Sequence, residues 1–437
     1  MQDLAGKRVV IMGLGRFGGG VGAARYCCEQ GAKVLVTDSL GQADLQSSLD
    51  RLADLPIEYR LGGHDEADFA SADVVVVNPG VDRRNNRYLQ AANGAATTTE
   101  IRLFIDTQCT GAGRLRTIGV TGTAGKSTTV AMIGHILAEA HGPDRVHVGG
   151  NIGGSLLDRL DRIRPDDWVV LELSSFMLEL IDNWSPHIGV MTNLADNHLD
   201  RHGTMGSYLA AKQKIFLHQS EGDVAVVPPM LAEWSMITPA RSVVADPFFY
   251  AGQLQIPGDH NRSNASSATA AAVATGVKVT DCARFLAGFT GLPHRLQRVA
   301  EHNGVRFFND SKCTTPEAAI LAIDSFKPRT AHVILGGYNK GADLRHVALH
   351  AARQCAGIYT VGQTGDAIAD AALPESDRCP VHRCGDLETA VRHVLDNVRP
   401  DQEVLLSPAC ASWDQFDNYE QRGKRFVEYV LKYTGAE

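Results

Sequence analysis

The residues from Thr117 to Ser127 have the types and spacing of a phosphate-binding loop. A short β-branched run, Thr117–Thr121, passes through glycines into the pair Lys126 and Ser127, and apolar residues at helical spacing follow. In such a turn, backbone N–H groups surround phosphates, the lysine reaches the outer phosphates and the hydroxyl holds Mg²⁺. Val120 stands where the usual pattern has its first glycine, so an ordinary surface turn remains the alternative. The expected phosphate contacts are Gly122, Thr123, Gly125, Lys126, Ser127 and Thr128.

A glutamate interrupts the next strongly apolar stretch. Residues 168–173 indicate a buried strand, and Glu172 lies near its end. A buried carboxylate is costly unless it is paired or bound to a metal, so this position suits a Mg²⁺ or water ligand. An ion pair with an arginine elsewhere is the alternative. A further strand, predicted over 189–193, leads into the polar run 197–202, which includes His198; a solvated loop is the alternative there.

Two helices then present polar residues on defined faces. Residues 208–216 indicate a helix in which Lys212 follows two alanines, so a lysine lies on a small-residue face. Residues 258–264 open an alanine-rich helix, and Asn261 and Asn264 share one face of its first turn. A capping role would need only one of these two asparagines.

The N-terminal residues indicate a strand, a glycine turn, a helix and a second strand. Gly13, Gly15 and Gly18 fit G-x-G-x-x-G after the predicted strand 7–12, and the strand 33–36 leads to Asp38. This is the dinucleotide-binding pattern, in which the acidic residue meets a ribose hydroxyl. The pattern alone is weak, because many such sheets bind other nucleotides. With the apolar run 74–77, the alternation predicts a parallel, doubly wound sheet that binds ligands at its carboxyl edge.

The last third of the chain indicates another α/β sheet. Strands are predicted over 305–309, 332–335, 358–361 and 403–407, after a hinge at 292–296. Polar clusters follow three of them, at 310–312, 336–340 and 407–412. Three such clusters at one sheet edge predict a binding surface.

Length and composition limit the class of protein. The 437 residues suit two to four domains. An excess of acidic residues, 50 against 42 basic ones, argues against nucleic acid or an anionic membrane as the main partner. Nine cysteines without a C-x-x-C spacing indicate reduced thiols. Because no signal-like start or long apolar run occurs, we expect a cytoplasmic protein.

With these residues in place, the chain resembles the Mur ligases, and among them the MurD group, the UDP-N-acetylmuramoyl-L-alanine:D-glutamate ligases. The shared motifs keep their order along the whole chain. They are Thr-Gly-Thr-x-Gly-Lys-Ser at 121–127, Gly-Asn-Ile-Gly at 150–153, Glu-Leu-Ser-Ser-Phe at 172–176, His-Leu-Asp-Arg-His at 198–202, Ala-Ala-Lys at 210–212, His-Asn-x-x-Asn at 260–264, Pro-His-Arg at 293–295, Asn-Asp-Ser-Lys at 309–312, Ser-Pro-Ala-Cys-Ala-Ser at 407–412 and Glu-Gln-Arg-Gly at 420–423.

The resemblance implies an α/β protein with three domains. They are a Rossmann-like uridine-substrate domain (1–112), a central P-loop ATPase domain (113–294) and a Rossmann-like amino-acid domain (295–437). It implies ATP-dependent addition of D-glutamate to UDP-N-acetylmuramoyl-L-alanine through an acyl phosphate, in peptidoglycan precursor synthesis. Partners would be these small molecules, with no nucleic acid or membrane, and we expect a monomer.

The resemblance also implies a role for each matching residue. The catalytic residues would be Lys126, His198 and Lys212, and Mg²⁺ would be held by Ser127, Glu172, His198 and a carbamylated Lys212. The ATP site would add Asn261, Asn264, Arg295 and Asp310 to the loop residues. The uridine substrate would contact Gly15, Arg16, Phe17, Asp38, Ser39 and Asn151. The glutamate would contact Lys312, Thr314, Lys340, Ser412 and Tyr419.

Two departures from the family pattern and several alternatives accompany this prediction. Ala124 replaces an asparagine in the phosphate loop, and Asn197 replaces an aspartate before His198, which alters polarity near nucleotide and metal. The enzyme could add L-glutamate or another amino acid. A folylpolyglutamate-type ligase would not need the N-terminal sheet, and a nucleotide sensor without catalysis is a further alternative. An oxidoreductase would leave the phosphate loop unexplained.

Overall fold

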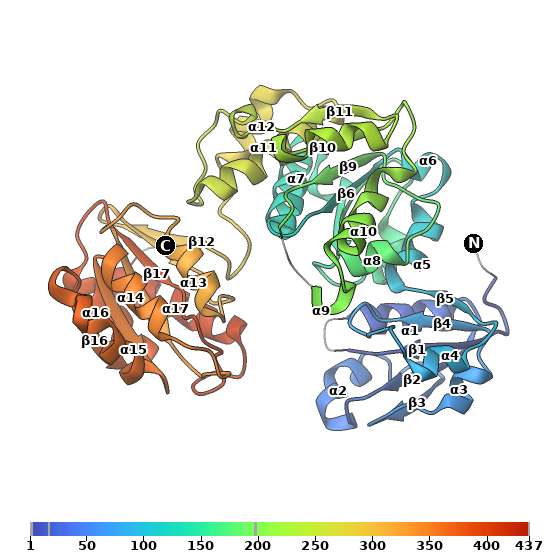
Figure 1. Ribbon diagram of the computed structural model, residues 1–437, viewed down its shortest axis with the longest axis horizontal. Helices are drawn as coiled ribbons and strands as arrows, with labels where there is room; N and C mark the ends of the chain where they lie inside the picture. Colours follow the sequence, from blue (N-terminus) through green and yellow to red (C-terminus); the bar gives the residue numbers. More distant parts are fainter. Residues whose placement is uncertain (1–2, 16–17, 196–198, 436–437) are drawn as a thin grey trace. The chain divides into compact units, whose positions relative to one another are not determined.

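The structure is a computed structural model that describes residues 3–15, 18–195 and 199–435. The chain forms two compact units, Met1–Ala251 with Ser263–Phe285, and Gly252–Arg262 with Leu286–Glu437. The first unit contains two sheets, at the N-terminal and middle parts of the chain, and the second contains one (Figure 1). The three-way division into substrate-specific domains stays a prediction.

The first sheet has five parallel strands in the order β3-β2-β1-β4-β5. Its valine-rich central strands are buried, as expected for a parallel sheet covered on both faces. The strands are β1 (Arg8–Met12), β2 (Lys33–Asp38), β3 (Ile57–Leu61), β4 (Val74–Val77) and β5 (Ala96–Thr98). The helices are α1 (Gly19–Glu29), α2 (Gln42–Asp50), α3 (Glu66–Ala70), α4 (Arg87–Ala91), α5 (Glu100–Gln108) and α6 (Gly111–Arg114).

The second sheet has six parallel strands in the order β11-β10-β9-β6-β8-β7. The strands are β6 (Thr117–Thr121), β7 (Val146–Gly150), β8 (Trp168–Glu172), β9 (Ile188–Met191), β10 (Val224–Val227) and β11 (Arg241–Val244). The helices are α7 (Lys126–His141), α8 (Ser175–Glu179), α9 (Leu199–His202), α10 (Met205–Leu217), α11 (Asp259–Ala274) and α12 (Val279–Leu286), with 3₁₀ turns η1 (Pro143–Arg145), η2 (Leu156–Arg162), η3 (Pro229–Ile237) and η4 (Pro247–Phe249).

The sheet of the second unit has the order β12-β13-β17-β14-β15-β16, and only β12 runs antiparallel to its neighbour. The strands are β12 (Gln297–His302), β13 (Val305–Asn309), β14 (Ala331–Gly336), β15 (Gly357–Val361), β16 (Val381–Gly385) and β17 (Glu403–Leu406). The helices are α13 (Pro316–Ile323), α14 (Arg345–Gln354), α15 (Gly365–Ala372), α16 (Leu387–Asn397) and α17 (Tyr419–Thr434), with the 3₁₀ turn η5 (Leu373–Arg378).

The predicted strands and the helix at 208–216 are confirmed to within a few residues. In the phosphate-loop sheet, β6 lies between β8 and β9, so their carboxyl ends meet at one edge. Glu172, the end of β9 and the phosphate loop therefore lie close together.

Two predictions from composition can be compared with the structure. All nine cysteines carry free thiols, as expected, and only Cys28 is not buried. Across the described parts of the chain, no helix is long and apolar enough to cross a bilayer.

Candidate functional site

The phosphate loop joins β6 to α7, and glycines shape it. Gly125 precedes α7 with φ of 79°, a left-handed conformation that favours glycine. A Cβ there would also lie 2.2 Å from Oδ1 of Asn264, so the helix that carries Asn264 packs directly on the loop. The backbone N–H of Ala124 donates to Oδ1 of Asn193 at 2.9 Å. Asn193 therefore braces the loop at the position where the family asparagine is missing.

Two lysines meet at the start of this loop. Nζ of Lys126 donates to the carbonyl oxygens of Gly122 and Thr123, both at 3.0 Å. Nζ of Lys212, from α10, donates to the same Gly122 oxygen at 2.8 Å. Burial and the charge of Lys126 lower the pKa of Lys212 to about 7. Lys212 is 1% exposed, so its side chain is buried and does not face solvent.

Tyr208 joins Lys212 to the loop. Nζ of Lys212 lies 4.6 Å from the centre of the Tyr208 ring, and the Tyr208 hydroxyl lies 3.0 Å from Oγ1 of Thr123. Tyr208 precedes Lys212 by four residues on α10, so both lie on the same helix face. That spacing is the signal in the sequence that could have identified Tyr208.

Glu172 has a carboxylate oxygen suited to a metal ion. The residue is 2% exposed, and Oε1 accepts a hydrogen bond from Nδ2 of Asn151 at 3.0 Å. Oε2 is buried without a hydrogen-bond partner among the described residues. A buried, unsatisfied carboxylate oxygen fits a hard cation such as Mg²⁺. No arginine pairs with Glu172 in the described part of the chain, so the ion-pair alternative finds no support there.

The other predicted metal ligands are placed as follows. Ser127 lies half-buried in the first turn of α7. His198 lies outside the described residues. In the described ranges, no cluster of three His, Cys, Asp or Glu residues is arranged to hold a metal. The predicted set is not such a cluster, because it joins Glu172 to a serine, a lysine and His198.

The two asparagines of α11 have different surroundings. Oδ1 of Asn264 lies 3.4 Å from Oγ1 of Thr129 in α7, beside the phosphate loop. Nδ2 of Asn261 donates to the carbonyl oxygen of Pro257 at 2.6 Å. Both residues are buried. Thr128 is also buried, in the first turn of the helix that follows the loop.

Asp38 supports the glycine turn of the N-terminal sheet. Its Oδ2 accepts a hydrogen bond from the N–H of Gly15 at 3.1 Å, and its Oδ1 accepts one from Leu40 at 2.9 Å. Asp38 lies at the carboxyl end of β2, as predicted, and Ser39 next to it is exposed. Arg16 and Phe17 lie outside the described residues. Asn151 donates a hydrogen bond to Glu172, and its contact with the substrate stays a prediction.

In the second unit, Asp310 follows β13 and is buried. Its Oδ1 accepts from the N–H of Leu296 at 3.1 Å and its Oδ2 from the Ser407 hydroxyl at 2.8 Å. Burial raises the pKa of Asp310 to about 6, although the charge of Arg295 opposes this shift. Arg295 is half-buried near Asp310. The structure therefore brings these two predicted nucleotide contacts together.

The predicted glutamate contacts surround the carboxyl edge of the same sheet. Nζ of Lys312 lies 5.5 Å from the centre of the Tyr419 ring, and Nζ of Lys340 lies 4.5 Å from that of Trp413. Both lysines are exposed, Thr314 is half-buried, and Ser412 is buried. Two exposed cations at one edge of the sheet fit a dicarboxylate.

A buried arginine, Arg422 of α17, organises this edge. Its guanidinium donates to the backbone oxygens of Ser311, Cys410 and Ala411 at 2.9, 3.0 and 3.2 Å, and to the Ser311 hydroxyl at 3.0 Å. Burial lowers its pKa to about 10. Arg422 belongs to the Glu-Gln-Arg-Gly motif, but the resemblance assigns no role to it.

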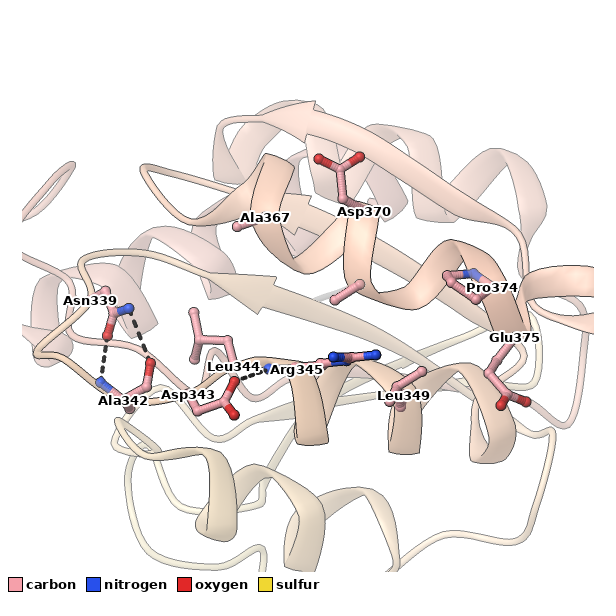
Figure 2. A pocket seen from close by; sticks show the side chains of 11 residues that line it. Asn339, Ala342, Asp343, Leu344, Arg345, Leu349, Ala367, Asp370, Pro374 and Glu375 are labelled. Atoms are coloured by element: carbon pink, nitrogen blue, oxygen red, sulfur yellow. Dashed lines mark hydrogen bonds between the residues drawn. The ribbon is translucent and has the colours of Figure 1, made fainter.

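Asn339 shapes the loop that carries Lys340. Its Oδ1 accepts from the N–H groups of Gly341 and Ala342, both at 2.9 Å, and its Nδ2 donates to the Ala342 carbonyl (Figure 2). The loop borders a cavity of about 640 Å³ between α14 and α15. Asp343, Arg345, Asp370 and Glu375 contribute charged side chains to its lining (Figure 2).

A phosphate loop on a parallel sheet, with two lysines on one backbone oxygen and a carboxylate at the same edge, defines a P-loop nucleotide-dependent enzyme. Family models match three consecutive parts of the chain. They are the Mur ligase MurD-like N-terminal domain (residues 7–99), the Mur ligase middle domain (120–241) and the Mur ligase glutamate ligase domain (294–410). The chain belongs to the Mur ligase family, in its MurD-like branch.

Curated relatives match along their whole length. UDP-N-acetylmuramoylalanine–D-glutamate ligase of Pelotomaculum thermopropionicum is 37% identical, with 99% of each chain covered. The protein of the same name from a Roseiflexus species is 38% identical, with 99% of this chain and all of the relative covered.

Solved structures show the same fold at lower identity. UDP-N-acetylmuramate–alanine ligase MurC of Thermotoga maritima aligns with a TM-score of 0.58 and 20% identity, covering 98% of this chain and all of that one. MurF ligase of Thermotoga maritima, solved with ADP, aligns with a TM-score of 0.55 and 16% identity, covering all of this chain and 99% of that one. The predicted three-part α/β architecture is confirmed.

Proposed function

We propose that this chain is an ATP-dependent ligase that joins D-glutamate to UDP-N-acetylmuramoyl-L-alanine in peptidoglycan precursor synthesis. The observation that carries this function is the full-length similarity to relatives that bear this activity in their names. The phosphate loop, with Lys126 and Lys212 on one carbonyl oxygen, is a site of the kind that this chemistry needs.

The reaction follows from the chemistry of a carboxylate. ATP transfers its terminal phosphoryl group to the carboxylate of the alanyl substrate, which yields an acyl phosphate and ADP. The glutamate amine attacks the acyl carbon, and the tetrahedral intermediate collapses with loss of phosphate and a proton. Lys126 compensates phosphate charge during the first step, and the lysines at 312 and 340 hold the carboxylates of glutamate. Alignment of the two substrates supplies much of the rate.

Mg²⁺ completes this proposal. Ser127, Glu172, His198 and a carbamylated Lys212 would hold it, and the free Oε2 of Glu172 supports the assignment. When bound, Mg²⁺ neutralises charge on the phosphates. Carbamylation requires a neutral amine that attacks CO₂ and loses a proton. A lysine whose pKa is about 7 supplies neutral amine at physiological pH.

The remaining roles are assigned by position. Gly15, Arg16, Phe17, Asp38, Ser39 and Asn151 would contact the uridine substrate. Asn261, Asn264, Arg295 and Asp310 would contact the adenosine of ATP, and Thr314, Ser412 and Tyr419 would join the two lysines in the glutamate site. We also propose that the protein is a cytoplasmic monomer with domains at 1–112, 113–294 and 295–437.

Phosphate release tests this function. We expect release from ATP only when UDP-N-acetylmuramoyl-L-alanine and an amino acid are both present. Release without either substrate would indicate a simple nucleotidase, and binding of ATP without any turnover would indicate a sensor. Protection of residues 1–110 from proteolysis by NAD, but not by uridine diphosphate, would favour the oxidoreductase alternative.

A further inference from the structure

A row of side chains around His202 links the N-terminal sheet to the ATP-binding sheet within the first unit. Arg83, which follows β4, pairs with Oε2 of Glu179 in α8. Oε1 of Glu179 lies 2.9 Å from Nδ1 of His202, and Nε2 of His202 lies 2.9 Å from the Ser175 hydroxyl. The His202 side chain is fully buried. The Glu179–His202 contact is electrostatic, because Nδ1 does not make an aligned hydrogen bond.

Stacked side chains reinforce this row. The rings of Phe176 and His202 are parallel within 6°, with centres 5.0 Å apart. The Arg201 guanidinium lies over the Phe176 ring, 4.1 Å from its centre. It also donates to the Val81 carbonyl oxygen at 2.9 Å. Helices α8 and α9 therefore contact the segment 78–83, which follows β4, through two arginines. Arg83 belongs to that segment and Arg201 to α9.

Both ends of the row reach residues with proposed roles. Asn78 begins the segment after β4, and its Nδ2 donates to the Gly13 carbonyl at 3.3 Å. A Cβ on Gly13 would lie 2.9 Å from Cβ of Asn78, so this segment packs against the proposed uridine-binding turn. At the other end, the His202 ring centre lies 5.1 Å from that of Tyr208, which contacts Thr123 of the phosphate loop.

We propose that His202 is a positioning residue, which fixes the segment 78–83 relative to the phosphate loop and so aligns the alanyl carboxylate with ATP. This role rests on the proposed ligase function. Neither ring nitrogen needs to touch a substrate. The His202 imidazole connects the Glu179 carboxylate, which pairs with Arg83 of the N-terminal part, to the hydroxyl of Ser175, three residues after Glu172.

A residue that positions the two substrates affects the rate, because the reaction depends on their alignment. The carboxylate and the terminal phosphate must approach within about 3–3.5 Å, and a displacement of about 1 Å can cost about a hundredfold in rate. The two substrates would be held by different sheets, so the reaction depends on contacts between these sheets. Burial lowers the pKa of His202, although the charge of Glu179 opposes this shift.

The test uses His202→Phe, Arg83→Gln and the double variant. Phenylalanine keeps a flat ring against Phe176 but removes both nitrogens, so the fold is retained while the link is lost. We expect each single variant to lower kcat/KM for the uridine substrate about tenfold, with ADP affinity unchanged. In the double variant, kcat/KM should fall no further than in the more strongly impaired of the two single variants, because both substitutions break the same link. His202→Gln, which keeps an amide for Ser175, should recover part of the activity.

Arg102→Gln is the matched control. Arg102 also reaches across this boundary, to the Asp182 carbonyl, but it makes no contact with the His202 row. The kcat/KM of Arg102→Gln for the uridine substrate should stay within about twofold of the unmodified enzyme's value. Unchanged kcat/KM in His202→Phe, losses that multiply in the double variant, or an equal loss in Arg102→Gln would each overturn the proposal.

Hydrogen exchange separates this proposal from the ligase function. In His202→Phe, the amides of segment 78–83 should exchange faster than in the unmodified protein, whereas those of α2 should not change. Faster exchange in a protein that releases no phosphate would retain the link and reject the ligase function. Unchanged exchange in an active ligase would reject the link.

Discussion

The side-chain amines of Lys126 and Lys212 donate to one backbone oxygen, that of Gly122, at 3.0 and 2.8 Å. Lys212 is buried, and the nearby charge of Lys126 repels a second ammonium group, so the pKa of Lys212 falls to about 7. The loop thus holds one lysine as a cation for phosphate while favouring a neutral, reactive amine on the other.

Lys126→Ala should abolish ATP turnover. The substitution removes the cation that meets the phosphates at the head of α7, and loss of such a contact in a closed site costs about a hundredfold or more in rate. Steady-state phosphate release measures the effect, and circular dichroism confirms that the fold is retained. Near-normal turnover in the folded variant would reject the assignment of this loop.

Lys212→Ala should lose most activity, about a hundredfold, and a small carboxylate such as acetate should restore part of it better than chloride does. A carboxylate can take the place of the carbamate as an anionic ligand. In the enzyme with Lys212 intact, at a fixed CO₂ concentration, activity should fall as pH drops below about 7, because the amine becomes protonated and stops reacting with CO₂. Mass spectrometry of the trapped carbamate checks the modification. A fully active Lys212→Ala enzyme in bicarbonate-free buffer would show that the lysine is ordinary.

Asp310→Asn should stabilise the second unit at neutral pH. Folding raises the pKa of Asp310 to about 6, so ionisation favours the unfolded state as pH rises from about 4 to 6. The amide removes this cost, and the free energy of unfolding should rise by about 1–3 kcal/mol at pH 7. Hydrogen exchange of β13 and β17 amides measures it. The gain should shrink toward pH 4, and a gain that does not depend on pH would contradict this explanation.

Arg422→Lys should raise the KM for the amino acid. A lysine cannot donate to all four oxygens that the guanidinium now holds, so the segment 410–412 would lose its support. We expect an increase of about tenfold, with the KM for ATP nearly unchanged. Arg425→Lys, on the same helix but exposed and paired with Glu428, is the control. An equal rise in the KM for the amino acid in both variants would show that Arg422 does not support the segment 410–412 in the way described.

Much of the fold could be predicted from local sequence. Apolar runs such as Val74–Val77 and glycine turns before helices are dictated by neighbouring residues, so strands, helices and the carboxyl-edge positions of Glu172 and Asp310 were predicted from sequence. The resemblance added the order of the domains, because motifs specific to the family recur along the whole chain.

Other features depend on partners far away in the sequence. Asn193 braces Ala124 across 69 residues, and Arg422 holds oxygens 11 to 111 residues away. Periodicity cannot reveal such pairs. The pairing of Asn151 with Glu172 is another case, since both residues were predicted to act but not to contact each other.

Identification of the product decides whether the enzyme joins D-glutamate to the alanyl substrate. The enzyme is incubated with ATP, Mg²⁺, UDP-N-acetylmuramoyl-L-alanine and, in turn, each enantiomer of glutamate and a panel of other amino acids. Mass spectrometry should find the substrate extended by one glutamate residue in the D-glutamate reaction, with one ADP and one phosphate formed for each product. Extension by L-glutamate or another amino acid instead, or phosphate release without any extended product, would contradict the account.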